Sequence, residues 1–297
     1  MMEKYKQLIC VFLFGWVLSA CQPHSKAQEN QYMNNQKTVN LHLGPQGVQD
    51  FMTYTDGKVD QQPAGMNFMD LDWNPPNLGK VRIEHGVNSL ELEHVFSVMG
   101  AQLANDPNIK GIKSIVVNAG LTQEEFVEPE QAYAAYVELM QRINKAGWKQ
   151  YFYRFSGRIA KEDNIKYILD RKEVVDPNYI LSFKEWQYIF NEIPTESFGY
   201  RLYVNGVLLT FTLDRTSINE KKQEQYMLRY SFQTIRYDER NSITGSYKMD
   251  ANEIEEAFKK MLERNKQARL YEEKKLKTEG YRIDESYKDP DVWPYVK

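Results

Sequence analysis

Short alternations of hydrophobic and polar residues predict strands in the first part of the chain beyond its N-terminal segment. Residues 41–43 and 81–83 alternate in this way, and the sequence NPPNLG at 74–79 forces an irregular loop between them. The run IKSIVV, Ile112–Val117, is predicted to be an inner strand. We interpret Leu90–Leu103, between these strands, as a helix. This part of the chain is therefore expected to be rich in β-structure.

The next part of the chain switches to apolar residues at three- and four-residue steps, the period of a helix with one buried face. The first such helix begins at Pro129, which suits a first helical turn, and stops at Gly147. WKQYFYRF, Trp148–Phe155, alternates and is predicted to be a strand. A short helix is expected around Ile165–Leu169, and SFKE at Ser182–Glu185 has the spacing of a capping box that begins another.

The clearest local signal is YRLYVNGVLLTFTLDR, Tyr200–Arg215. It contains two β-prone runs joined by Asn205-Gly206, a pair that tolerates the positive φ of a type I′ turn. Tyr226–Ile235 alternates again, so we expect an antiparallel meander. Asp250–Glu253 then caps a long helix, and its apolar face thins out beyond Leu270, where we expect the helix to project from the body.

Together these patterns predict an α+β fold in which antiparallel hairpins and a β-meander pack with helices, and in which the C-terminal helix is long. We divide the chain into a signal peptide at 1–20, a flexible tether at 21–37, an N-terminal β-rich sub-domain at 38–121 and a C-terminal α+β sub-domain at 122–297.

The first twenty residues have the layout of a secretory signal peptide. Lys4 and Lys6 precede the apolar run Leu8–Leu18, and small residues follow at 19–20. The apolar run is about half of the ~20 residues that a membrane-spanning helix needs. We therefore expect the segment to be cleaved after export.

Leu18–Cys21, LSAC, resembles the lipobox of bacterial lipoproteins. The resemblance implies that Cys21 receives a diacylglycerol, becomes the first residue of the mature chain and anchors it to a membrane. The alternative is an ordinary signal peptide in which Cys21 is incidental. Gln22 follows, where an aspartate would signal retention at the inner membrane, so the resemblance favours the inner leaflet of the outer membrane and a periplasmic location, with a surface-exposed destination left open.

Gln22–Lys37, QPHSKAQENQYMNNQK, is polar and nearly free of aliphatic residues, so it is predicted to be a tether rather than part of a folded core. As a random coil it would span roughly 20 to 25 Å on average. The formal net charge of the whole chain is -3. This balance predicts no nucleic-acid partner, which would require a basic face.

Motifs that carry chemistry are not found in the sequence. There is no G-x-S-x-G, no H-E-x-x-H and no glycine-rich phosphate loop. His85 and His94, with Glu91 and Glu93, can be pictured as a metal cluster, but their spacing matches no standard ligand pattern. We therefore expect no catalytic, cofactor or metal site, and a protein that is not an enzyme.

Aromatic residues offer candidates for recognition, because the chain has twenty tyrosines. Alternating tyrosines, as at 151–153 and 226–230, are typical either of an interaction surface or of one side of a sheet under a helix. We favour the second interpretation. The C-terminal Trp293-Pro-Tyr295 is a candidate exposed anchor, or else it docks on its own domain.

Several aromatic and turn landmarks between Trp148 and Thr234 are similar to those of immunity lipoproteins encoded beside lipase effectors of the type VI secretion system. The family pattern has a proline near Ser156-Gly-Arg158 that this chain lacks. The landmarks are Gly147–Tyr151 (GWKQY), Asp176–Tyr179 (DPNY), Phe183–Trp186 (FKEW), Tyr203–Leu209 (YVNGVLL) and Tyr226–Thr234 (YMLRYSFQT).

This resemblance implies a periplasmic, lipid-anchored immunity protein that binds a cognate secreted effector, a phospholipase, and neutralises it by occlusion. It assigns no toxin-contacting residue, so the partner-binding residues stay unknown. The alternative is a structural or assembly lipoprotein that binds another protein of the cell envelope.

Overall fold

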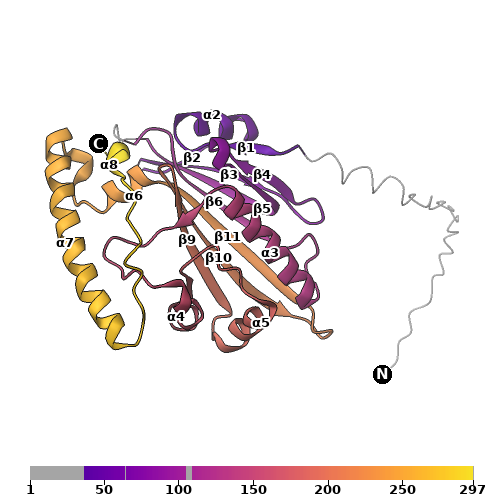
Figure 1. The fold of residues 1–297 in the computed structure, drawn as a ribbon. Coiled ribbons are helices and arrows are strands. Elements are labelled where there is room, and N and C mark those ends of the chain that lie inside the picture. Colours follow the sequence, from indigo (N-terminus) through magenta and orange to yellow (C-terminus); the bar gives the residue numbers. More distant parts are fainter. Residues whose placement is uncertain (1–36, 64, 105–108, 297) are drawn as a thin grey trace, which may run out of the picture. The chain divides into compact units, whose positions relative to one another are not determined.

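An 11-stranded sheet with helices on both faces is the centre of the fold (Figure 1). The computed structural model describes residues 37–63, 65–104 and 109–296. The strands are β1 (Val39–Leu41), β2 (Asp60–Gln61), β3 (Met66–Asp72), β4 (Gly79–Ile83), β5 (Leu90–Leu103), β6 (Ile112–Gly120), β7 (Lys149–Gln150), β8 (Glu173–Val174), β9 (Ser197–Val204), β10 (Val207–Ile218) and β11 (Glu224–Thr234). The helices are α2 (Pro45–Tyr54), α3 (Pro129–Lys145), α4 (Asn164–Arg171), α5 (Phe183–Glu192), α6 (Ile235–Asn241), α7 (Ala251–Thr278) and α8 (Trp293–Val296), with 3-10 turns at Gly86–Asn88, Lys161–Asp163 and Ser246–Lys248. The fold is α+β with a long C-terminal helix, as predicted.

The sheet continues across residue 121, where we expected a boundary between two sub-domains. Its strand order is β1-β4-β5-β6-β11-β10-β9-β7; β3 pairs with β2 and β5, and β8 pairs with β9. Pairs β1–β4 and β8–β9 are parallel, whereas the long central strands pair antiparallel. Backbone hydrogen bonds between β6 and β11 therefore join the two expected sub-domains into a single sheet within the compact unit of residues 37–297.

The two faces of the sheet build separate hydrophobic clusters. Leu208 and Leu209 are neighbours on β10, yet they belong to different clusters because successive side chains of a strand point to opposite faces. The larger cluster packs α3 and α5 on one face, where the ring centroids of Tyr136 and Trp186 are 4.8 Å apart. The smaller cluster packs α6, α7 and α8 on the other face, through residues such as Phe258.

The meander at β9, β10 and β11 forms as predicted. Asn205 and Gly206 have φ of 42° and 84°, the left-handed values that a type I′ turn requires at both central positions. The Ser182–Glu185 capping box is present, with Glu185 N–H donating to Ser182 Oγ at 3.3 Å. Local turn and cap chemistry was therefore a reliable guide in this half of the chain.

The predicted helix at residues 90–103 is wrong, because this segment is the 14-residue strand β5. Leu90 and Leu92 are buried on one face, and register shifts on both sides of Val95 interrupt the alternation, so that Val95 and then Val98 are buried as well. β5 pairs with β3 and β4 on one side and β6 on the other. Pairing partners on both sides decide its conformation, and they are invisible to a local pattern.

The strand predicted at Trp148–Phe155 is reduced to the two residues of β7. β9 offers one outer edge, and β8 pairs with Gly199 and Tyr200 along part of it. β7 therefore pairs only with Leu202 and Tyr203, and the chain leaves the sheet after Tyr151 N–H donates to Arg201 O.

The C-terminal half of α7 does not project from the body, contrary to our expectation. Arg269, Glu273 and Leu276 are buried. Arg269 and Glu273 lie 15 residues after Ile254 and Phe258, which is about four helical turns, so they continue the buried stripe that begins there. Charged side chains thus occupy buried positions in the part of α7 where apolar residues become sparse.

The predicted signal peptide, Cys21 and all but the last residue of the predicted tether lie outside the described residues. In the described part of the chain, no helix combines the length and the apolar character needed to cross a membrane.

Candidate functional site

A cleft of about 1010 Å³ opens beyond the outer edge of β7. Its lining comes from five segments, residues 147–152, 159–162, 175–178, 203–205 and 283–290. The last of these belongs to residues 279–292, here called the strap, which connects α7 to α8 along the length of α7 (Figure 1). Residues far apart in the sequence thus meet at one sheet edge.

Backbone hydrogen bonds fix the first half of the strap to the segment that follows β7. Ala160 N–H donates to Arg282 O at 3.0 Å, and Asp284 N–H donates to Arg158 O at 2.6 Å. The Arg282 guanidinium also pairs with the Asp163 carboxylate at 2.6 Å. These contacts lower the pKa of Asp163, chiefly through the hydrogen bond from the Arg282 side chain.

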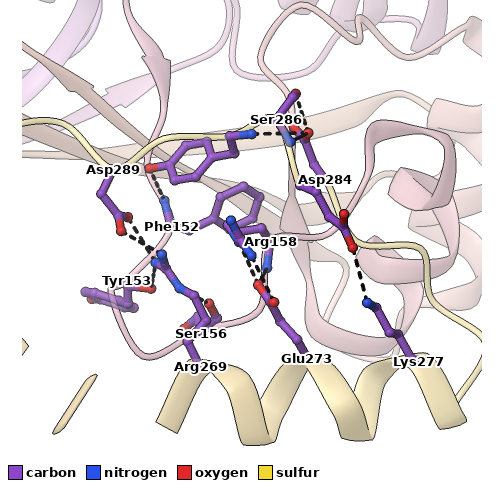
Figure 2. A network of polar contacts seen from close by, with 12 residues as sticks. Phe152, Tyr153, Ser156, Arg158, Arg269, Glu273, Lys277, Asp284, Ser286 and Asp289 are labelled. Carbon is purple, nitrogen blue, oxygen red and sulfur yellow. Dashed lines mark hydrogen bonds and ion pairs between the residues drawn. The ribbon is translucent and has the colours of Figure 1, made fainter. Parts of the chain in front are cut away.

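Two ion pairs tie α7 to this assembly (Figure 2). Arg158 Nε donates to Glu273 Oε1 at 2.7 Å, and Arg269 Nη1 donates to Asp289 Oδ2 at 2.6 Å. Burial alone would raise the pKa of the Glu273 carboxyl, but the hydrogen bonds from Arg158 hold it below its ordinary value. Arg269 also donates to Tyr153 O, so one side chain on α7 binds both the strap and the segment that follows β7.

Aromatic packing completes the strap. The Phe152 and Tyr287 rings meet edge to face with centroids 4.9 Å apart, and Phe152 N–H donates to Tyr287 Oη at 3.2 Å. Ile159, Val175 and Tyr281 are buried in the same small cluster. The cleft therefore has a wall held by backbone, ionic and apolar contacts together.

The polar groups of the cleft differ in how far they are already engaged. Asp284 accepts from the Ser286 hydroxyl and from the amides of Ser286 and Tyr287, and these bonds lower its pKa, that of the hydroxyl most. Glu285 pairs with Lys277 at 3.4 Å. Gln150 Oε1, by contrast, is buried without a hydrogen-bond partner among the described residues.

Lys149, Lys161 and Lys288 line the cleft, and none of them forms an ion pair within the described residues. All three are exposed. Ser286 is the hydroxyl nearest to a carboxylate, but it acts as the donor of an Asx-type turn, which stabilises the strap. The arrangement is suited to holding a ligand through hydrogen bonds and charge.

The residues pictured as a metal cluster are not brought together. Glu91 and Glu93 both bind Lys80, at 2.8 and 3.5 Å. His94 Nδ1 lies 3.1 Å from Gln123 Oε1. Among residues 37–63, 65–104 and 109–296, no three His, Cys, Asp or Glu side chains gather in a group that could hold a metal ion.

The aromatic candidates are mostly part of the core. Tyr151, Tyr226 and Tyr230 are buried, and the last two lie on one face of β11 under the helices, as we favoured. Trp293 stacks on Phe258 with ring centroids 5.3 Å apart. The C-terminal motif therefore docks on its own domain instead of serving as a free anchor.

Sequence reasoning missed the strap and its ion pairs. The available signal was the spacing of Arg269 and Glu273, which lie 15 residues after Ile254 and Phe258 and so fall on the buried stripe of α7. A charged residue at a stripe position indicates a buried ionic partner. The sequence pattern does not identify that partner, because Arg158 is 115 residues from Glu273 in the chain.

Comparison with protein-family models, with curated proteins and with solved structures found no match.

Proposed function

We propose that the protein is a lipid-anchored immunity protein of the periplasm that binds a cognate secreted effector and neutralises it by occlusion. The observation that carries this proposal is the cleft at the β7 edge, which is open, partly polar and built on a firmly held wall. Rigid walls favour binding because little conformational freedom is lost when a partner docks.

The sequence resemblance falls on the same part of the molecule. Three of the five resembling segments contribute residues to the cleft, namely Gly147–Tyr151, Asp176–Tyr179 and Tyr203–Leu209. We therefore place the effector contact at this edge, and infer an effector of the lipase class encoded beside this protein. The protein itself turns over no substrate in this proposal.

Cys21 supplies the anchor in this proposal, at the inner leaflet of the outer membrane. Intact mass spectrometry of the membrane-extracted protein should show an acylated chain that begins at Cys21. The Cys21→Ala variant should lack the lipid and keep the wild-type circular dichroism spectrum, because the cysteine lies outside the compact unit of residues 37–297. A wild-type mature chain without lipid would contradict the anchor.

The decisive test is a calorimetric titration of the full lipoprotein, purified in detergent, with the secreted protein encoded next to it. We expect tight binding at equal molar amounts and complete loss of the lipase activity of the partner. An interface of ~1,600 Å² is sufficient for such affinity when it is well packed. If the titration releases no heat and the partner is not inhibited at tenfold excess, the immunity proposal is rejected. Capture of an envelope-assembly protein would favour the structural alternative.

A further inference from the structure

We propose that the outer face of the C-terminal half of α7 docks on a membrane surface that carries anionic lipid headgroups. The inference rests on the proposed lipid anchor for bringing the domain close to a membrane, whereas the recognition chemistry comes from the described residues. The docking face, here called the basic face, consists of Arg264, Gln267, Ala268, Tyr271, Lys274, Lys275 and Thr278.

Helical geometry turns the basic face away from the protein. Successive residues of a helix are rotated by roughly 100°, so the residues three, four and seven positions from Tyr271 share its side of α7. Every residue of the basic face is exposed. Arg269, Glu273 and Leu276 are buried on the opposite side. Figure 1 shows α7 as the outermost element on its side of the sheet, so the basic face is open to a large partner.

The C-terminal half of α7 is basic, although the formal net charge of the chain is -3. Residues 264–278 contain six lysines and arginines but only two glutamates, and both glutamates lie off the basic face. Glu273 is buried against Arg158. Glu272 is partly buried on the flank toward α4, where burial and this carboxylate together raise the pKa of Tyr167 to about 12. The basic face therefore carries cations and no carboxylate.

Carboxylates of the chain itself engage only part of this positive charge. Lys275 lies 3.7 Å from Glu279, at the C-terminal end of the basic face. Glu263 precedes the basic face and accepts a hydrogen bond from Gln267 Nε2 at 2.9 Å. An anionic surface would supply the missing counter-charges. The cations of residues 264–278 that form no ion pair within the described part of the chain are Arg264, Lys266 and Lys274.

Two apolar side chains project among these cations. Tyr271 is 74% exposed in the middle of the basic face, and Leu270 is 54% exposed beside it. Leu270 lines a shallow hollow of about 440 Å³ with Glu273, Lys274, Lys277 and Thr278. Tyrosine rings are favoured at the level of lipid headgroups, and exposed leucines can enter the boundary with the acyl chains. The apolar and the basic side chains therefore suit the same surface.

The kind of cation favours a lipid surface over an acidic protein. Four of the five exposed cations between Arg264 and Thr278 are lysines. Lysine is depleted at protein–protein interfaces, where aromatic residues and arginine predominate. Clusters of lysine and arginine on a helix beside a membrane are typical of binding to anionic lipids, and each contributes about 1 kcal/mol. An acidic protein surface is the competing occupant, and the experiment separates the two.

The test places the photoreactive residue p-benzoylphenylalanine at Tyr271 of the full chain. The protein is reconstituted in phosphatidylcholine vesicles with or without about 30% phosphatidylglycerol and irradiated, and intact mass spectrometry measures lipid adducts. We expect at least about fivefold more adducts with the anionic lipid, because several cations contact it. Salt at about 1 M should abolish the difference. Equal adducts in the two kinds of vesicle, or none in either, would overturn the inference.

A second probe separates docking of α7 from mere proximity to the membrane. The photoreactive residue is placed at Gln141, which is exposed on α3. This helix packs on the face of the sheet opposite to α7, and the protein carries the same N-terminal segment. We expect few adducts at Gln141 in both kinds of vesicle. Equal labelling at the two positions would mean that the chain has no preferred orientation, which rejects the docking face.

Charge reversal tests the basic face directly. The triple variant Arg264→Glu, Lys266→Glu, Lys274→Glu should reduce adducts at Tyr271 to the level seen with neutral vesicles. A matched control carries three charge reversals at exposed positions elsewhere, as Lys58→Glu, Lys184→Glu, Lys221→Glu, and should keep at least half of the adducts. Loss in both variants would assign the effect to net charge and reject the docking face. Circular dichroism checks folding, and glutamine at the same three positions of α7 replaces any variant that does not fold.

Addition of the neighbouring secreted protein distinguishes the remaining outcomes. If the probe at Tyr271 crosslinks to that protein and not to lipid, the basic face is a protein interface and the lipid inference is wrong. If lipid adducts form but the effector is neither bound nor inhibited, the docking face stands and the immunity proposal fails. If the effector is inhibited but no lipid adducts form, the immunity proposal stands and the docking face is wrong.

Discussion

α3 and α7 are both amphipathic helices that cover the sheet, but they are held by different physical means. α3 has a continuous apolar stripe on the larger cluster. α7 begins in the same way on the opposite face, and its second half is then held by ion pairs to loops. The buried residues are Ala132, Tyr136, Leu139, Met140 and Ile143 on α3, and Ile254, Phe258, Met261, Arg269, Glu273 and Leu276 on α7.

The difference follows from what each helix covers. α3 lies on the side chains of long central strands, whose apolar faces need only exclusion from water. The second half of α7 lies on the irregular segment 152–160, which has carbonyl groups and arginines to satisfy. The second half of α7, which packs on loops, therefore uses ion pairs, whereas the buried stripe of α3 uses only uncharged hydroxyl hydrogen bonds beside its apolar contacts.

The largest expected effect comes from disrupting the apolar packing of α3. Tyr136→Ala on α3 should lower the free energy of unfolding by about 4 kcal/mol, because it removes a fully buried ring and the hydroxyl that bonds Tyr200 and Leu181 N–H. Urea unfolding monitored by fluorescence measures the change. The control Tyr188→Ala removes a ring that is 47% exposed and should cost below about 1 kcal/mol.

A smaller effect is expected from disrupting an ion pair of α7. Glu273→Gln should destabilise by about 2 to 3 kcal/mol, because it leaves the partly buried Arg158 guanidinium without its carboxylate. Hydrogen exchange should show faster opening of the strap than of the sheet. Glu255→Gln breaks the exposed pair with Lys259 and should change stability by about 0.5 kcal/mol or less.

A double variant sharpens this result. Arg158→Met combined with Glu273→Leu should be close to wild type in stability, because a buried ion pair can be replaced by apolar packing of similar volume. If the double variant were as unstable as Glu273→Gln, the strap would depend on the ion pair itself and not on the filling of its site.

A single-residue effect smaller than that of Glu273→Gln depends on pH and concerns Asp238 on α6. Burial, with the neighbouring charge of Glu239, raises the pKa of Asp238 to about 6 from the ordinary 3.8. Between these two values the folded state holds a proton that the unfolded chain has lost, so stability falls as pH rises from about 4 to about 6.

Asp238→Asn removes this titration. We expect it to be more stable than wild type at pH 7.5 by about 1 to 2 kcal/mol, and equal to wild type at pH 4. Unfolding midpoints in urea across this pH range are the measurement, with Glu220→Gln in an exposed turn as control. A difference that did not vary with pH would show that the carboxylate is not the cause.

Most elements were predictable where local pattern and tertiary environment agree. The Pro129 helix, the Asn205-Gly206 hairpin and the Ser182 capping box were confirmed, because turn and cap preferences act within a few residues. The segment 90–103 was mispredicted because its pairing partners come from separate strands. The strand at 148–155 was overextended because β8 competes for the edge of β9.

The candidate site was out of reach of the sequence for a related reason. The cleft exists only where the β7 edge meets the strap, and Arg158 and Glu273 come together across more than a hundred residues. What the sequence determined by itself was the α+β class, the meander and the helix caps, since each depends on short-range patterns. Only the tertiary structure decided which charges are buried in pairs, because electrostatic pairing depends on distance in space and not on separation along the chain.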